Sequence, residues 1–83
     1  MKLSGEKPKG QYVELRIVLA SSKEHYHYVD SNAYFQRTKE ALREIIRGEV
    51  AKMFMNGISF ENENSIEFVA PSQIKGVTAT FSS

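Results

Sequence analysis

Two histidines at alternate positions are the residues of this sequence best placed to do chemistry. His25 and His27 lie in the segment Glu24 to Asp30. If this segment is a strand, their side chains project from the same face, about 7 Å apart, and two imidazoles at that spacing can share a metal ion. A zinc site needs a third and usually a fourth ligand. The sequence has no further histidine and no cysteine, so the pair is a weak metal candidate and we expect no metal or cofactor.

The same pair has two other interpretations. The two imidazoles can form a pH-sensitive interface, because histidine changes its charge close to neutral pH. The simplest interpretation is a solvent-facing pair on a short strand, with Tyr26 and Tyr28 turned toward the core. All three interpretations require a strand over residues 24–29, which its aromatic and β-branched side chains favour.

The remaining residues do not predict catalysis. No serine lies in a nucleophile-elbow context, and Gly57 and Gly76 stand singly, without a phosphate-binding loop. A chain of 83 residues buries roughly 63% of its unfolded surface, which gives one modest core and no cleft between two lobes. We therefore expect a non-catalytic protein that has no small-molecule substrate.

A basic stripe predicts one binding function. Lys39, Arg43 and Arg47 follow one another at i, i+4 spacing, which places them along one flank of a helix. Tyr12 and Arg16 lie on the non-core face of the first strand, where they can stack on a base or meet a phosphate. Two glutamates run beside the stripe and partly neutralise it. Sequence-tolerant nucleic-acid binding is therefore the alternative function, and it gains weight if Tyr12 and the stripe share one surface.

Apolar residues at the end of the helix, together with a bare strand edge, predict protein binding instead. Methionine is adaptable and frequent at binding surfaces. The final strand, from Gly76 to Phe81, is rich in threonine and has no charged residue to block a free edge. Strand addition there would form a homodimer or capture another protein. The predicted contact residues are Met53, Phe54, Met55, Val77, Ala79 and Phe81.

Composition narrows the class of protein further. The chain is 41% hydrophobic and 25% charged, which is ordinary for a globular domain, and the absence of cysteine excludes disulfides and thiol chemistry. The longest apolar run, residues 17–20, is too short to cross a bilayer. We therefore expect a cytoplasmic protein without membrane contact. The net charge is +1, yet residues 1–60 are net basic and residues 61–83 net acidic, a split that suits association between protein surfaces.

Hydrophobic periodicity predicts the elements that position these residues. Residues 11–20 alternate as a strand, residues 21–23 form a turn, and residues 24–29 form a second strand. Spacing of three and four then predicts a helix over about 32–55, stopped by Asn56-Gly57. Short strands follow, at Ile58 to Phe60, at residues 66–70 and, after an interruption at Pro71, at residues 77–81.

Two residues disturb the predicted helix. Gly48 lies in its interior, and Glu49 falls inside the apolar arc. A bend or break at Gly48 that rephases the last turn explains both and is the favoured interpretation. The alternative is that Glu49 is a buried functional acid, which is costly without a partner.

Together, the elements predict an α+β fold of the order ββαββ(β). One long helix would pack across a small mixed sheet over residues 11–83, preceded by a flexible tail over residues 1–10. In the order and size of its elements this resembles the β-grasp arrangement of ubiquitin-like domains, although no motif carries the likeness and it implies no activity. A compact module of this kind is typical of accessory proteins of phages and mobile elements, so we expect a small protein-binding or self-assembling accessory module.

Overall fold

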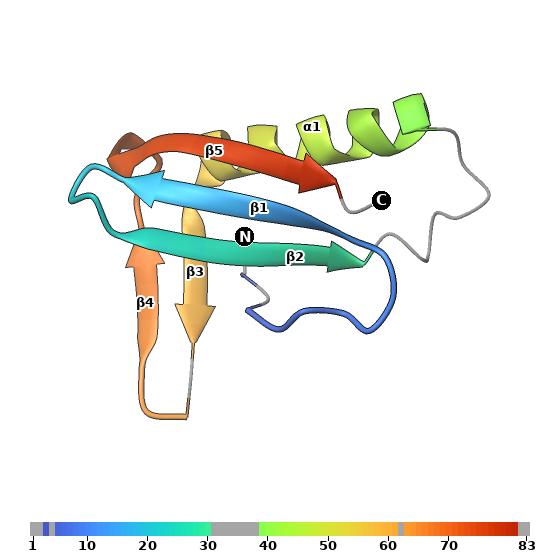
Figure 1. Cartoon of the computed structure of the whole chain (residues 1–83). Coiled ribbons are helices and arrows are strands. Elements are labelled where there is room, and N and C mark those ends of the chain that lie inside the picture. The colour runs from blue at the N-terminus through green and yellow to red at the C-terminus, as the bar shows by residue number, and fades with distance from the viewer. Residues whose placement is uncertain (1–2, 4, 31–38, 62, 82–83) are drawn as a thin grey trace.

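A computed structural model describes residues 3, 5–30, 39–61 and 63–81 of the chain. The helix and strands over these residues are an antiparallel sheet, a separate hairpin and one helix that lies against the sheet, which confirms the α+β prediction (Figure 1). In chain order the elements are β1 (Tyr12–Leu19), β2 (Glu24–Asp30), α1 (Lys39–Asn56), β3 (Ile58–Glu61), β4 (Ile66–Val69), a 3-10 turn (Pro71–Gln73) and β5 (Ile74–Phe81).

The main sheet has three strands in the order β2-β1-β5. In β1, Val13, Leu15, Ile17 and Leu19 are buried, so the predicted alternation is confirmed. The predicted turn at residues 21–23 joins β1 to β2, and there the N–H of Ser22 donates to the carbonyl of Leu19 at 2.8 Å. Both pairings of β1 are antiparallel. The sheet is therefore entirely antiparallel, and the mixed sheet expected from the sequence is wrong. The β-grasp likeness is not confirmed.

The hairpin of β3 and β4 runs crosswise to the main sheet and projects past β2 (Figure 1). Its two strands are antiparallel, with Ile58 opposite Val69. On its other side, β3 accepts a hydrogen bond from the chain's N-terminal segment, because the N–H of Leu3 donates to the carbonyl of Ser59 at 2.8 Å. Leu3 also belongs to the buried core. This contact concerns Leu3 alone, and the flexible tail expected over residues 1–10 stays a prediction.

The helix covers the sheet through the apolar stripe that the sequence predicts. Ile46 and Met53 are buried in the core, and Leu42 and Val50 pack against it. The helix ends at Asn56, and Gly57 has φ 78°, as expected for a glycine stop signal. The predicted start of the helix, near residue 32, falls on residues 31–38, outside the described residues.

The two irregularities inside the helix have a simple outcome. α1 is one continuous helix through Gly48, so a break at this residue is wrong, while a bend there stays a prediction. Glu49 is not a buried acid either, because it is partly exposed and lies 3.8 Å from the Nζ of Lys52. It sits at the edge of the covered stripe, where a carboxylate keeps contact with water. The helix of the described residues is not long and apolar enough to cross a membrane.

Candidate functional site

The outer edge of β5 is the first part of the candidate site. β5 is the last strand of its sheet, and within the described residues no strand pairs with its second edge. Val77 and Ala79 face the core side, while Thr78 and Thr80 are exposed on the opposite face. Lys75 is the only charged residue in the strand. The predicted position of this strand at a sheet edge is therefore confirmed, and its pairing with another strand stays a prediction.

A groove of about 390 Å³ lies between this strand and α1. The helix runs alongside β5 in Figure 1, so both elements contribute to the groove over the same stretch. The lining residues are Arg43, Ile46, Arg47, Val50, Ala51, Ala79 and Phe81. Most of this lining is apolar. A strand added to β5 would place alternate side chains against it, because side chains of a strand alternate between its two faces.

Two arginines give the groove a positive wall. The guanidinium of Arg43 lies over the ring of Phe81, 5.4 Å from its centroid, a cation–π contact. Arg47, one helical turn further on, forms an ion pair with Glu44 on the exposed surface of α1. No carboxylate is among the described residues that line the groove. The site therefore combines an apolar floor with positive charge.

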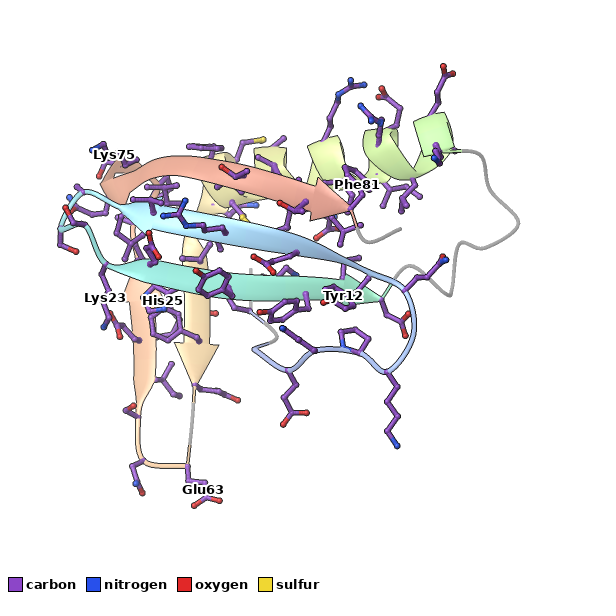
Figure 2. The ribbon with its side chains drawn as sticks, viewed as in Figure 1. Tyr12, Lys23, His25, Glu63, Lys75 and Phe81 are labelled. Atoms are coloured by element: carbon purple, nitrogen blue, oxygen red, sulfur yellow. The ribbon has the colours of Figure 1, made fainter. Side chains whose placement is uncertain are left out.

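The predicted contact residues divide into three groups in the structure. Met53 is completely buried in the core, so its assignment as a contact residue is corrected: a side chain without exposed surface cannot meet a partner. Phe54 and Met55 are 44% and 75% exposed at the C-terminal end of α1. Phe81 instead lies at the far end of β5, beside Arg43 (Figure 2). Val77 and Ala79 lie on the same face of β5 as Phe81.

The residues of the nucleic-acid alternative do not form one surface. Tyr12 and Arg16 lie on the face of the sheet opposite the core side, and α1 covers the other face (Figure 2). The ring of Tyr12 meets that of Tyr28 edge to face, at 5.6 Å, and Arg16 forms an ion pair with Glu24. Lys39, Arg43 and Arg47 all belong to α1, on the other side of the sheet.

The histidine pair faces the core side, opposite to the simplest interpretation of the sequence. His27 stands opposite Leu15 and His25 opposite Ile17, two buried residues, so Tyr26 and Tyr28 lie on the outer face. His25 packs on the ring of Phe60 at 4.2 Å, and its Nε2 is buried without a hydrogen-bond partner among the described residues. Within the same residues, no group of three or more potential ligands could hold a metal ion.

This placement predicts that acid destabilises the fold. Burial lowers the pKa of His25, and the charge of Lys23 adds to this effect while Glu67 opposes it. Burial also lowers the pKa of His27, which Glu49 opposes. The unfolded chain takes up protons near the ordinary pKa of 6.5, before the folded chain does. The contribution of the two neutral histidines to the free energy of unfolding is therefore complete above pH 6.5 and is lost as the pH falls below it.

The measurement is urea unfolding of the wild type and of His25→Phe between about pH 7 and pH 5. The free energy of unfolding of the wild type should fall over this range, and that of the variant should fall less, because the phenyl ring keeps the contact with Phe60 without a titrating nitrogen. A variant that loses as much stability as the wild type would show that His25 does not contribute.

Sequence reasoning missed one exposed apolar surface. Ile66 and Phe68 on β4 are 60% and 78% exposed, although their alternation predicts a core-facing strand. The hairpin instead turns its other face inward: Phe60 of β3 contacts His25, and Glu67 of β4 lies 3.8 Å from Lys23. Alternation identifies the two faces of a strand but not which of them is covered. The run of acidic and polar residues between Phe60 and Ile66 was the available signal that this hairpin extends into solvent.

The fold and site define a small α+β domain with an open sheet edge beside a positively charged groove. No family model matches the chain, and neither a curated protein nor a solved structure matches it.

Proposed function

We propose that this protein is a non-catalytic binding module that takes up an extended, acidic polypeptide segment along the free edge of β5. One observation carries the proposal: the edge of β5, unpaired in the part of the chain that the structure describes, lies beside the groove shared with α1. A bare edge supplies main-chain hydrogen bonds for affinity, and an adjacent groove supplies pockets for alternate side chains. Both requirements of strand addition are present at the same place.

The chemistry of the groove indicates what the segment carries. Ile46 and Val50 form part of the apolar lining, and Ala51 leaves room for an incoming side chain. Arg43 and Arg47 are four residues apart, about 6 Å along the helix, which is close to the spacing of alternate residues on a strand. Acidic side chains at alternate positions would thus meet both arginines, and guanidinium groups bind carboxylates well.

Nucleic-acid binding is the weaker candidate. Its residues are divided between the outer face of the sheet and the helix, and Arg16 already pairs with Glu24 on its own surface. Nucleic acid bound along one strand needs a continuous positive track with stacking side chains. The division of these residues favours the polypeptide over the nucleic acid as the ligand.

The test is selection of a displayed library of random short peptides against the purified protein, followed by binding measurements on two variants. Ala51→Tyr fills the groove from the helix, at a position already exposed to solvent. Lys52→Tyr places the same side chain on the next residue of α1, which is also exposed but does not line the groove. We expect selected peptides to bind the wild type and Lys52→Tyr and to lose roughly tenfold or more in affinity for Ala51→Tyr, since about 1.4 kcal/mol corresponds to tenfold.

Selected peptides should also be acidic and should shift the backbone amide resonances of β5. Peptides that bind both variants equally, or that shift resonances only on the outer face of the sheet, would contradict the proposal.

A further inference from the structure

The β3–β4 hairpin carries a second free edge and the apolar side chains to go with it. Among the described residues β4 pairs only with β3, so the opposite edge of β4, its outer edge, is unpaired. Ile66 and Phe68 stand on the same face of β4 and are 60% and 78% exposed. Two large apolar side chains on a bare edge strand of a projecting hairpin are an unusual exposure for a monomer.

The tip of the same hairpin is acidic. Glu61 ends β3 and Glu63 lies in the turn between the strands. Both are exposed, and Figure 2 shows Glu63 at the tip, away from the rest of the molecule. The groove beside β5 contains Arg43 and Arg47 and no carboxylate among its described lining residues. The hairpin of one molecule and the groove of another are therefore complementary both in charge and in apolar surface.

Strand polarity brings these features together. If β4 pairs antiparallel with β5, the start of β4 lies beside the end of β5, which places the acidic turn next to Phe81 and Arg43. In Figure 1 the hairpin lies on the α1 side of the main sheet. Phe60 of the hairpin contacts His25 of that sheet, and the strand register puts Ile66 and Phe68 on the opposite face of the hairpin. Rotating a second copy in the plane of the figure, so that its β4 edge meets β5, keeps these side chains on the side of α1.

We propose that the segment bound at β5 is the β3–β4 hairpin of a second copy of this chain, so that molecules associate head to tail. This proposal rests on the function proposed above and names its partner. Ile66 and Phe68 would enter the apolar groove, and Glu61 and Glu63 would face the two arginines. The hairpin and the groove are different surfaces, so a molecule whose groove is occupied can still insert its own hairpin into a further copy. The assembly is therefore an open chain or a ring.

A symmetric pairing of two β5 strands explains less of the structure. Lys75 is the only charged residue of β5, so a second β5 would bring no carboxylate to Arg43 and Arg47. It would also leave Ile66 and Phe68 exposed. Association through the hairpin covers these side chains and supplies the charges in one contact.

The experiment exchanges the charges of the two surfaces and measures mass by light scattering over a range of concentrations. One variant carries Arg43→Glu with Arg47→Glu, and the other carries Glu61→Lys with Glu63→Lys. Alone, each variant has like charges on both surfaces and should associate roughly tenfold or more weakly than the wild type. An equimolar mixture should associate again, because the hairpin of each variant then fits the groove of the other.

The matched control is Lys39→Glu with Lys52→Glu, which changes the charge of α1 by the same amount at residues that do not line the groove. This control should associate like the wild type. Thermal unfolding of every variant shows whether it is folded, and recovery in the mixture requires two folded proteins.

Three results would overturn the inference: a wild type that stays monomeric at every concentration, charge variants that associate as strongly as the wild type, or a mixture of the two variants that stays monomeric. In each case, peptides selected at the β5 groove and lost in Ala51→Tyr would still support the proposed function. Loss of the peptides as well would remove both proposals.

Discussion

Gly57→Ala should destabilise the protein strongly, by about 3 kcal/mol or more, because an L-residue resists the left-handed conformation and must also clash here. Gly57 has φ 78°, and a Cβ at this position would lie 2.4 Å from the carbonyl oxygen of Val69. That oxygen belongs to the backbone of β4, so it cannot move aside without displacing the hairpin. The expected result is a large loss of the free energy of unfolding, measured by urea denaturation.

Gly48→Ala is the matched control for this substitution. Gly48 lies inside α1, and a Cβ there would meet no atom within 4 Å apart from the adjacent residues and backbone of its own helix. Alanine is a better helix former, so this variant should gain up to about 1 kcal/mol. The same change in side chain then has opposite signs at the two glycines. Equal stability of the two variants would contradict the structure at the junction of α1 and β3.

Met53→Ala should remove about 2–5 kcal/mol of stability, the range found when a fully buried large side chain is truncated in a packed core. Met53 has no exposed surface and belongs to the core cluster that joins α1 to the main sheet. Truncation leaves a cavity in the middle of that cluster. In a chain of 83 residues the loss is a large part of the total stability, so urea unfolding should shift clearly toward lower concentrations.

Met55→Ala provides the comparison two residues away. Met55 is 75% exposed, so its truncation should change stability by no more than about 0.5 kcal/mol. This pair of variants tests the correction made to the sequence prediction, which assigned both methionines to a contact surface. A similar cost at both positions would contradict the placement of Met53 in the core.

The strands were predictable where one face of the chain is continuously covered. In β1 the alternation of Val13, Leu15, Ile17 and Leu19 identifies both the strand and its buried face, because the whole strand lies under the core. The end of the helix was equally clear from Asn56-Gly57, since a glycine after a helical pattern marks a left-handed position. Neighbouring residues along the chain determine both the buried face of β1 and the end of the helix, so both could be predicted from the sequence.

The orientation of the remaining strands depends on which elements meet in three dimensions. His25 and His27 turn inward because β2 pairs with β1 in a register that sets them opposite buried residues. Ile66 and Phe68 turn outward because the hairpin packs through Phe60 and Glu67. A shift of the strand register by one residue exchanges the two faces of a strand but leaves the alternation in the sequence the same. Alternation alone therefore could not predict which face is buried.

The candidate site was predictable only in part, for the same reason. The bare edge of β5 follows from its threonine-rich, weakly charged sequence, and the structure places this strand at an edge. The groove depends on α1 lying along that edge, which is a tertiary arrangement. Arg43 and Arg47 were identified as a stripe for nucleic acid, and their position beside Ala79 and Phe81 gives them a different role in our proposal.

Hydrogen exchange of the backbone amides, at low and at high protein concentration, tests the use of the β5 edge most directly. The account predicts that amides of β5 and of β4 become protected together as the concentration rises, while those at the exposed N-terminal end of α1 do not change. Exchange in β5 that stays the same while the protein associates through another surface, or at concentrations where it does not associate at all, would contradict the account.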